Sequence, residues 1–240
     1  MILDLDAGNT RCKWRVVDKE KRVRKSGNNT LEQFCAIAFD KPGIRRVRVS
    51  SVRGADTDAM ITRWANARLT LDAEFAVAAR RCGRVVNGYA DPERLGVDRW
   101  LAILAGYDEV RGALGVIDCG SAMTADIVDN DGLHRGGFIA PGLAMMSQSL
   151  LSGTDKIRFD ATQRAPGLDP GRDTGVAVCN GVLLAACGFV IQAIERLREV
   201  CGEPVILMTG GDAELIAQRL GFSTNLRPSL VLDGLALALP

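Results

Sequence analysis

The chain has 240 residues, of which 47% are hydrophobic and 25% are charged, and its formal net charge at pH 7 is +1. This is the composition of an ordinary globular protein, and the length allows one large domain or two modest ones. Because the net charge is close to zero, it gives no electrostatic argument for a nucleic acid or a membrane surface as partner, and we expect neither.

Cysteine and histidine usage narrows the class further. The seven cysteines are scattered and contain no C-x-x-C pair, so we expect reduced thiols in a cytoplasmic protein. The first residues lack the basic segment of a secretory signal, and the longest apolar run, residues 182–191, is short for a membrane span. The single histidine, His134, lies in DGLHRGG, where we expect a turn. A zinc site or a histidine-based triad is therefore poorly supported.

The first part of the chain predicts a mixed sheet with helices. Ile2, Leu3 and Leu5 indicate a first strand, and the DAGNT turn follows it. Apolar and basic residues then alternate with the period of a half-buried strand. The expected elements, in chain order, are strands at 2–5, 11–16 and 21–26, a helix at 31–39, a strand at 45–52, a helix at 56–69, a strand at 74–78, a turn-rich loop at 83–91 and a helix at 92–107.

The pattern then restarts, which predicts an α/β protein of two domains, residues 1–111 and 112–240. We expect, in order, strands at 114–118, 123–128 and 133–139, a helix at 141–151, a loop at 152–171, a helix at 173–200, a strand at 204–208 and helices at 212–220 and 233–239.

An acidic-glycine turn occurs once in each half. Asp6-x-Gly8-Asn9-Thr10 and Asp118-x-Gly120-Ser121-Ala122 each follow a hydrophobic strand and lead into a returning strand. Glycine lets the backbone approach a ligand, and a carboxylate beside backbone donors suits a polyphosphate with its metal. A plain hairpin turn is the alternative for either one alone. As a pair, they would clamp a nucleotide between two domains that can hinge.

A third candidate element is Thr209-Gly210-Gly211-Asp212, between a strand and a helix. A double glycine there allows a flat group to approach the backbone, and helix N-terminal amides can meet an anion or a ribose.

Together these segments resemble the acetate kinase, sugar kinase, Hsp70 and actin superfamily, which has two ribonuclease-H-like (actin-like ATPase) domains with mixed sheets flanked by helices. Within it, the chain is most similar to type III pantothenate kinases. The segments that carry the resemblance are DAGNTRCKW (6–14), NGY (87–89), LGVDRW (95–100), IDCGSAMTADIVDNDGLHRGGFIAPG (117–142), DTGVAV (173–178) and TGGDAE (209–214). Ser121 stands where the family usually has threonine, and Gly175 where alanine is frequent.

The resemblance implies a reaction. The γ-phosphoryl group of ATP would pass to the hydroxyl of pantothenate, giving 4′-phosphopantothenate in the first step of coenzyme A biosynthesis. Magnesium, a monovalent cation (potassium or ammonium) and a homodimer are also implied. Such chemistry needs an oriented alcohol, neutralised phosphoryl charge and a base within reach. A nucleotide-binding regulatory or accessory protein of the same fold is the alternative, as is another kinase or a phosphatase of the superfamily.

The resemblance also implies the substrate residues. Asp98 would be the base, Arg99 would hold the polar end of the substrate or a phosphoryl oxygen, and Gly96 and Val97 would complete the site with Tyr89 and Thr174. Other readings stay open: Asp98 could pair with an arginine or a backbone amide, Arg99 with a nearby acid, and Thr174 could cap a helix.

The implied ATP-binding residues are Asp6, Ala7, Gly8, Asn9, Thr10, Arg11, Cys12, Lys13, Ser121, Gly210 and Gly211. Lys13 could instead be an outward-facing strand lysine. Asp118 matches the monovalent-cation position, and Asp6 would serve magnesium, either directly or through water. Asp126 could support these acids, whereas Asp129 fits a turn.

The helix at 173–200 is apolar around much of its circumference. Gly181 and Gly188 are seven residues apart and so share a face that permits close helix contact. A dimer or interdomain core would explain this face, and complete burial within one domain is the alternative.

Overall fold

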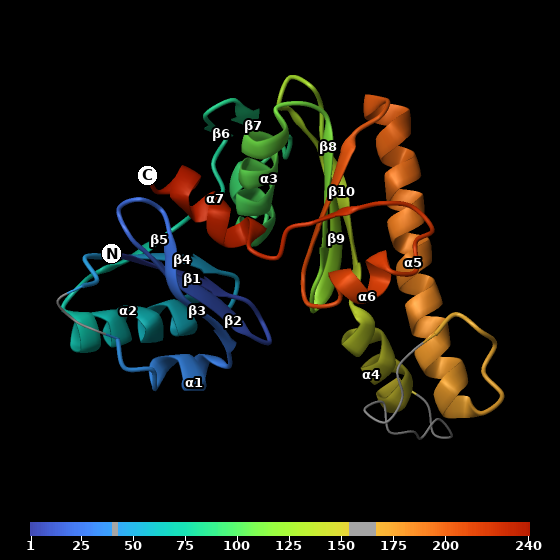
Figure 1. Ribbon diagram of the computed structural model, residues 1–240, viewed down its shortest axis with the longest axis horizontal. Coiled ribbons are helices and arrows are strands. Elements are labelled where there is room, and N and C mark those ends of the chain that lie inside the picture. Colours follow the sequence, from blue (N-terminus) through green and yellow to red (C-terminus); the bar gives the residue numbers. More distant parts are fainter. Residues whose placement is uncertain (40–42, 154–166) are drawn as a thin grey trace. The chain divides into compact units, whose positions relative to one another are not determined.

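The computed structural model (Figure 1) describes residues 1–39, 43–153 and 167–240. The chain forms two compact units. Unit 1 contains Met1–Glu109 and Ser229–Pro240, and unit 2 contains Val110–Pro228. The last twelve residues therefore lie in unit 1, which differs from the expected second domain of residues 112–240.

Each unit contains a five-stranded mixed sheet, and the two sheets have the same topology. The strand orders are β3-β2-β1-β4-β5 and β10-β9-β8-β11-β12. In both, the first three strands form an antiparallel meander, and the fourth and fifth strands add in parallel beside the first. The repeat that the two acidic-glycine turns indicate thus includes all five strands of each sheet. The strands are β1 (Ile2–Ala7), β2 (Cys12–Val17), β3 (Val23–Asn29), β4 (Arg46–Ser51), β5 (Ala73–Phe75), β8 (Leu114–Cys119), β9 (Ala122–Val128), β10 (His134–Pro141), β11 (Val205–Thr209) and β12 (Asn225–Leu226).

The two faces of the first sheet differ because residues on β1 alternate. Leu3, Leu5 and Ala7 are fully buried in the core formed with α1 (Leu31–Cys35) and α2 (Ala55–Leu69). Aromatic rings fill much of this core, with the centroids of Phe34 and Trp64 4.7 Å apart. Figure 1 shows both helices along one side of the sheet. The other residues of β1, including Asp4 and Asp6, face the opposite side.

Asp4 is fully buried on that opposite face and pairs with two arginines. Its Oδ1 accepts from Nε of Arg48 at 2.8 Å, and its Oδ2 accepts from Nε of Arg15 at 2.9 Å. Arg48 is itself only 4% exposed. A buried carboxylate needs such partners because isolated burial of a charge costs several kcal/mol.

The same arginines attach the C-terminal helix, α7 (Leu230–Ala238), to this face. Arg48 donates to the carbonyl of Leu239 at 3.0 Å, and Arg15 donates to the carbonyl of Leu232 at 2.7 Å and also pairs with Asp233. Gly234 packs directly on the Leu101 backbone of α3 (Val97–Val110), where a Cβ atom would collide. These contacts explain why the terminal helix belongs to unit 1.

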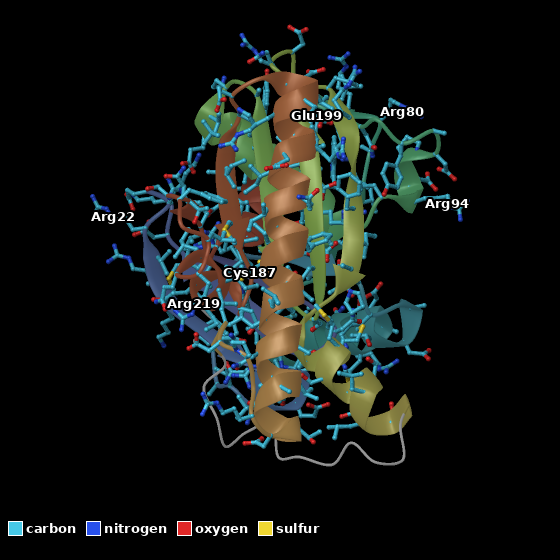
Figure 2. All side chains as sticks on the ribbon, turned by 90° about the vertical axis from the view of Figure 1, so that its right-hand side faces the viewer. Arg22, Arg80, Arg94, Cys187, Glu199 and Arg219 are labelled. Atoms are coloured by element: carbon cyan, nitrogen blue, oxygen red, sulfur yellow. The ribbon has the colours of Figure 1, made fainter. Side chains whose placement is uncertain are left out.

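In unit 2 the long helix α5 (Thr174–Cys201) packs on one face of the sheet, and Figure 2 views the unit from that side. Gly115 on β8 makes room for Leu197 of the helix. Of the described residues, α5 is the one helix long and apolar enough to cross a membrane by length and composition. Inside the unit 39% of its most apolar window is buried, so packing in the core accounts for part of this composition. The shorter helices are α4 (Leu143–Gly153) and α6 (Ala213–Ala217).

Several expected elements differ from the structure. The helix expected from residue 92 is interrupted: η1 (Pro92–Arg94) is a 3-10 turn, Leu95 is extended, and α3 begins at Val97. The expected loop at 83–91 includes a strand of the small β6 (Arg81–Cys82) and β7 (Val85–Val86) hairpin. The helix at 31–39 ends at Cys35, and β12 was not expected. Most of the loop expected at 152–171 lies outside the described residues.

The expectation that His134 lies in a turn was wrong. It begins β10, is 1% exposed, and its Nε2 lies 2.9 Å from Oδ1 of Asp126. The register of β10 against β9 shifts between His134 and Gly136, and sequence patterning does not reveal such an irregularity. Asp129 does serve the turn, since its Oδ1 accepts from the amides of Asp131 and Leu133.

The buried ion pairs of Asp4 generate a prediction. Asp4→Asn should lower the free energy of unfolding by about 3 kcal/mol, because it leaves the buried Arg48 without its counter-charge and removes one of the two carboxylates that pair with Arg15. Urea unfolding followed by tryptophan fluorescence measures the change. Glu203→Gln is the control, since that side chain is 90% exposed and should shift stability by less than about 0.5 kcal/mol. Equal effects of the two variants would contradict the structural role of Asp4.

Candidate active site

The first turn places three polar side chains in one row across the sheet. Asp6, the penultimate residue of β1, is the register partner of Lys13 on β2 and of Ser50 on β4. Residues directly opposite in neighbouring strands share a face, so all three lie on the side away from α1 and α2. The structure therefore brings Asp6 and Lys13 together, and both are half-buried.

Ser50 was not identified from the sequence. It is fully buried, and among the described residues its hydroxyl has no hydrogen-bond partner. Buried polar groups are nearly always hydrogen-bonded. This hydroxyl can therefore form a hydrogen bond with a group that binds beside Asp6. The available signal was the alternation in RVRVSSV, which puts Arg46, Arg48 and Ser50 on one face.

The loop between β1 and β2 combines exposed and buried residues. Asn9 and Thr10 are exposed, and Gly8 lies between them and the strand. The side chains of Ala7 and Cys12 are fully buried in the core, so only their backbone atoms can face a ligand. Burial raises the pKa of Cys12 to about 11, which keeps its thiol protonated. Arg11 is directed to β3, where its Nε donates to Oδ1 of Asn28 at 3.2 Å.

In unit 2 the second turn and the double glycine form one structure. Asp118 on β8 is the register partner of Thr209 on β11, so the segments that follow these strands are neighbours. Gly210 has a φ of +99° and packs so closely on the Cys119 backbone that a side chain there would collide. The amide of Asp212 donates to the carbonyl of Cys119 at 2.9 Å. Burial raises the pKa of Asp212.

Ser121 and Gly211 lie at the exposed part of the same structure. Gly142, which follows β10, packs against the backbone of this turn, and its amide donates to the carbonyl of Ser121 at 3.0 Å. This packing gives a physical reason for the glycine at the end of GGFIAPG. Asp126 pairs with His134 of the neighbouring strand, and this buried contact joins β9 to β10.

Asp98 lies in the first turn of α3, two positions after the non-helical Gly96. Its Oδ1 accepts from the Arg99 amide at 2.8 Å, the backbone contact that was one of its alternative roles. A Cβ atom at Gly96 would lie 2.7 Å from this same oxygen. The glycine therefore leaves room around the carboxylate, and the half-buried Val97 lies between the two.

Arg99 and Tyr89 form a pair. Arg99 is 7% exposed, its Nη1 donates to the Tyr89 hydroxyl at 3.0 Å, and its guanidinium carbon lies 5.7 Å from the Tyr89 ring centroid. Hydrogen bonding and cation–π attraction both fix the guanidinium relative to the ring. Gly96, Val97, Asp98, Arg99 and Tyr89 all belong to unit 1.

Thr174 belongs to unit 2. It is the exposed first residue of α5, and the helix cap is Asp173, whose Oδ1 accepts from the amide of Val176. The capping role considered for Thr174 was therefore wrong. Thr174 lines a groove of about 600 Å³ between α4 and α5, together with apolar residues that include Met146 and Leu150.

Comparison with known proteins identifies the family of the chain. A family model described as type III pantothenate kinase matches residues 2–196. Type III pantothenate kinases of Ectopseudomonas mendocina and Pseudomonas fluorescens are 41% and 40% identical to the chain over 248 residues, which cover 100% of it and 99% of each relative.

Solved structures show the fold. A Campylobacter jejuni protein described as a Baf family transcriptional activator has a TM-score of 0.64 at 22% identity, covering 98% of this chain and 95% of that one. A ROK family glucokinase from Streptomyces griseus, in complex with glucose and AMPPNP, has a TM-score of 0.52 at 12% identity, covering 98% and 97%. The expected fold of two mixed α/β units of the actin-like ATPase and sugar kinase type is confirmed. From its full-length sequence similarity and its fold, the chain belongs to the type III pantothenate kinase family.

Proposed function

We propose that Asp98 is the general base with which this type III pantothenate kinase phosphorylates pantothenate. The reaction uses ATP, gives 4′-phosphopantothenate and is the first step of coenzyme A biosynthesis. The observation that carries the assignment is the local structure of the G-x-D-R segment. Asp98 stands at the start of a buried helix, next to a glycine that leaves its carboxylate room, and beside an arginine held by Tyr89.

In this proposal Asp98 accepts the proton of the pantothenate hydroxyl as its oxygen attacks the γ-phosphorus. Its bond from the Arg99 amide holds the carboxylate in one orientation, which favours proton transfer over a short hydrogen bond. Arg99 would bind the carboxylate of pantothenate or a phosphoryl oxygen with its planar fork. Tyr89, Gly96, Val97 and Thr174 complete the proposed substrate site.

The two acidic-glycine turns are proposed to bind ATP. The backbone of residues 6–13 would contact the phosphates, with Lys13 adding positive charge, and Ser121, Gly210 and Gly211 would contact the nucleotide in unit 2. The side chains of Ala7 and Cys12 are excluded from this role by their burial.

Magnesium is proposed to bind at Asp6 through water, with Ser50 as a nearby polar group. Among the described residues no group of three or more histidine, cysteine or acidic side chains gathers as a metal site. Magnesium fits this situation, because it usually keeps several waters and uses one or two carboxylates with the substrate phosphates. The spare hydroxyl of Ser50 beside Asp6 supports the fit. The ion would neutralise phosphoryl charge.

A monovalent cation, potassium or ammonium, is proposed to bind at Asp118. This carboxylate is half-buried at the end of β8, beside a turn whose backbone is tightly packed. One carboxylate with neighbouring carbonyls suits a large, weakly hydrated cation better than magnesium.

A homodimer through α5 is also proposed. The outward face of this helix is apolar and small-chained: Leu184 is 59% exposed, Ile191 is 37% exposed, and Cβ atoms at Gly181 and Gly188 would meet open space. Smooth apolar surfaces of this kind usually mark an interface. A monomer in sedimentation velocity runs would argue against this assembly.

We propose a cytoplasmic location because all seven cysteines are free. Recovery of the native protein in another compartment would contradict this.

The base assignment predicts the effect of Asp98→Asn. Turnover of pantothenate should fall by about 10²- to 10⁴-fold, because the amide cannot accept the hydroxyl proton, while ATP affinity stays within about twofold. A coupled assay of ADP release and calorimetric titration with a non-hydrolysable ATP analogue measure the two. Asp91→Asn, on an exposed residue seven positions earlier, is the control. Wild-type turnover in Asp98→Asn would move the base role to another residue.

The cation assignment predicts a dependence on potassium. With magnesium and ATP present, turnover should rise severalfold when sodium is replaced by potassium or ammonium, and Asp118→Asn should abolish the difference. Thermal unfolding of the variant in sodium checks that the fold persists. An Asp118→Asn protein that is still activated by potassium would place the cation elsewhere.

A further inference from the structure

The loop that carries Tyr89 is bound from outside by one arginine. Arg80 donates from Nη1 to the carbonyls of Asn87 at 3.1 Å and Tyr89 at 2.7 Å, and from Nη2 to the carbonyl of Ala90 at 2.7 Å. Three carbonyls of one short loop thus converge on a single guanidinium group. Arg80 lies outside every segment that carries the family resemblance, and its sequence context gave no sign of this role.

The same loop is bound from inside by Asn87, which is 1% exposed. Its Oδ1 accepts from the Tyr89 amide at 3.0 Å, and its Nδ2 donates to the carbonyl of Pro92 at 3.1 Å. The Asn87 amide donates to the carbonyl of Arg80 at 3.0 Å. Tyr89 is therefore held at its amide by Asn87 and at its carbonyl by Arg80.

Tyr89 in turn is the group that holds Arg99. Its hydroxyl accepts from Nη1 of Arg99 at 3.0 Å, and its ring lies beneath the guanidinium. The exposed Arg80 is thus joined to the buried Arg99 through Tyr89: Arg80 bonds to the carbonyl of Tyr89, and Arg99 bonds to its hydroxyl. A shift of the Tyr89 backbone would move the hydroxyl that orients Arg99.

We propose that Arg80 is a positioning residue for the pantothenate site, acting through Tyr89 on Arg99. This inference rests on the proposed substrate role of Tyr89 and Arg99. The planar fork of arginine can meet several carbonyls at once, whereas lysine offers a compact ammonium on a flexible chain. A lysine at this position restores the charge and only part of the carbonyl contacts.

The expected effect is on substrate binding rather than on folding. Arg80 is exposed, so water can replace it at the three carbonyls and global stability should change little. What is lost is the order of the loop, and a loop that must be ordered on binding weakens affinity. ATP binding and turnover at saturating pantothenate should be unaffected, because the other residues remain in place.

The test compares Arg80→Ala and Arg80→Lys with Tyr89→Phe and with Arg94→Ala. Arg94 is the matched control, because it is an exposed arginine of the same peripheral part of unit 1, and Figure 2 labels both arginines. The measurements are KM for pantothenate, KM for ATP, kcat, Tm, and hydrogen exchange of the amides at residues 87–90.

For Arg80→Ala we expect KM for pantothenate to rise about 10-fold, with KM for ATP and kcat within about twofold of wild type and Tm lowered by less than about 3 °C. The Tyr89 amide should exchange faster. Arg80→Lys should fall between wild type and Arg80→Ala, and Arg94→Ala should match wild type.

An Arg80→Ala protein with wild-type KM for pantothenate overturns the inference if Tyr89→Phe raises that KM. An Arg80→Ala protein whose KM for ATP and Tm deteriorate together with KM for pantothenate also overturns it, because the residue is then a general stabiliser. If Tyr89→Phe itself leaves KM for pantothenate unchanged, the proposed substrate site is wrong, and faster exchange of the Tyr89 amide alone would then report only loop order.

Discussion

The structure depends on the period-two alternation of β1. One face of this strand supplies Leu3, Leu5 and Ala7 to the core, and the other presents Asp4 and Asp6 in a polar layer. Because side chains two apart share a face, both acids lie in the same layer but meet different neighbours. Asp4 lies between Arg15 and Arg48 and is consumed by structure. Asp6 lies nearer the glycine turn, in register with Lys13 and Ser50, and is the acid that we propose for magnesium.

This division gives the C-terminal helix a physical role. The arginines that neutralise Asp4 also bind the carbonyls of Leu232 and Leu239, so α7 covers the charged layer. Its Gly234 then lies on α3, the helix whose first turn contains Asp98 and Arg99. The proposed base, Asp98, is thus on a helix that packs against α7, and α7 covers the face of the sheet on which Asp6 lies. The cost of burying Asp4 and its two arginines is offset by their mutual ion pairs and by their hydrogen bonds to α7. The same contacts hold α7, and through it α3, in place.

Much of this could be predicted from the sequence. The repeated turns, the G-x-D-R segment and the double glycine are local patterns, and local patterns predict turns and the succession of strands along the chain well. Three features could not be predicted in this way: the bonds from Arg80 to the carbonyls of residues 87, 89 and 90, the register that sets Ser50 opposite Asp6, and the bond from Arg48 to Leu239. They depend on strand register and on packing between distant segments, and the hydrophobic periodicity of the sequence contains no information about either. The burial of His134 against Asp126 was missed for the same reason, because it depends on packing between neighbouring strands.

The most direct test of this account compares Asp6→Asn with Asp4→Asn in the same protein. Unfolding free energy from urea titration and turnover as a function of magnesium concentration are measured for both. Asp6→Asn should keep wild-type stability within about 1 kcal/mol but require about 10-fold more magnesium for half-maximal turnover. Asp4→Asn should show the wild-type magnesium dependence in its folded fraction. An Asp6→Asn protein that loses stability as Asp4→Asn does, or that keeps the wild-type magnesium dependence, would contradict the division of roles along β1.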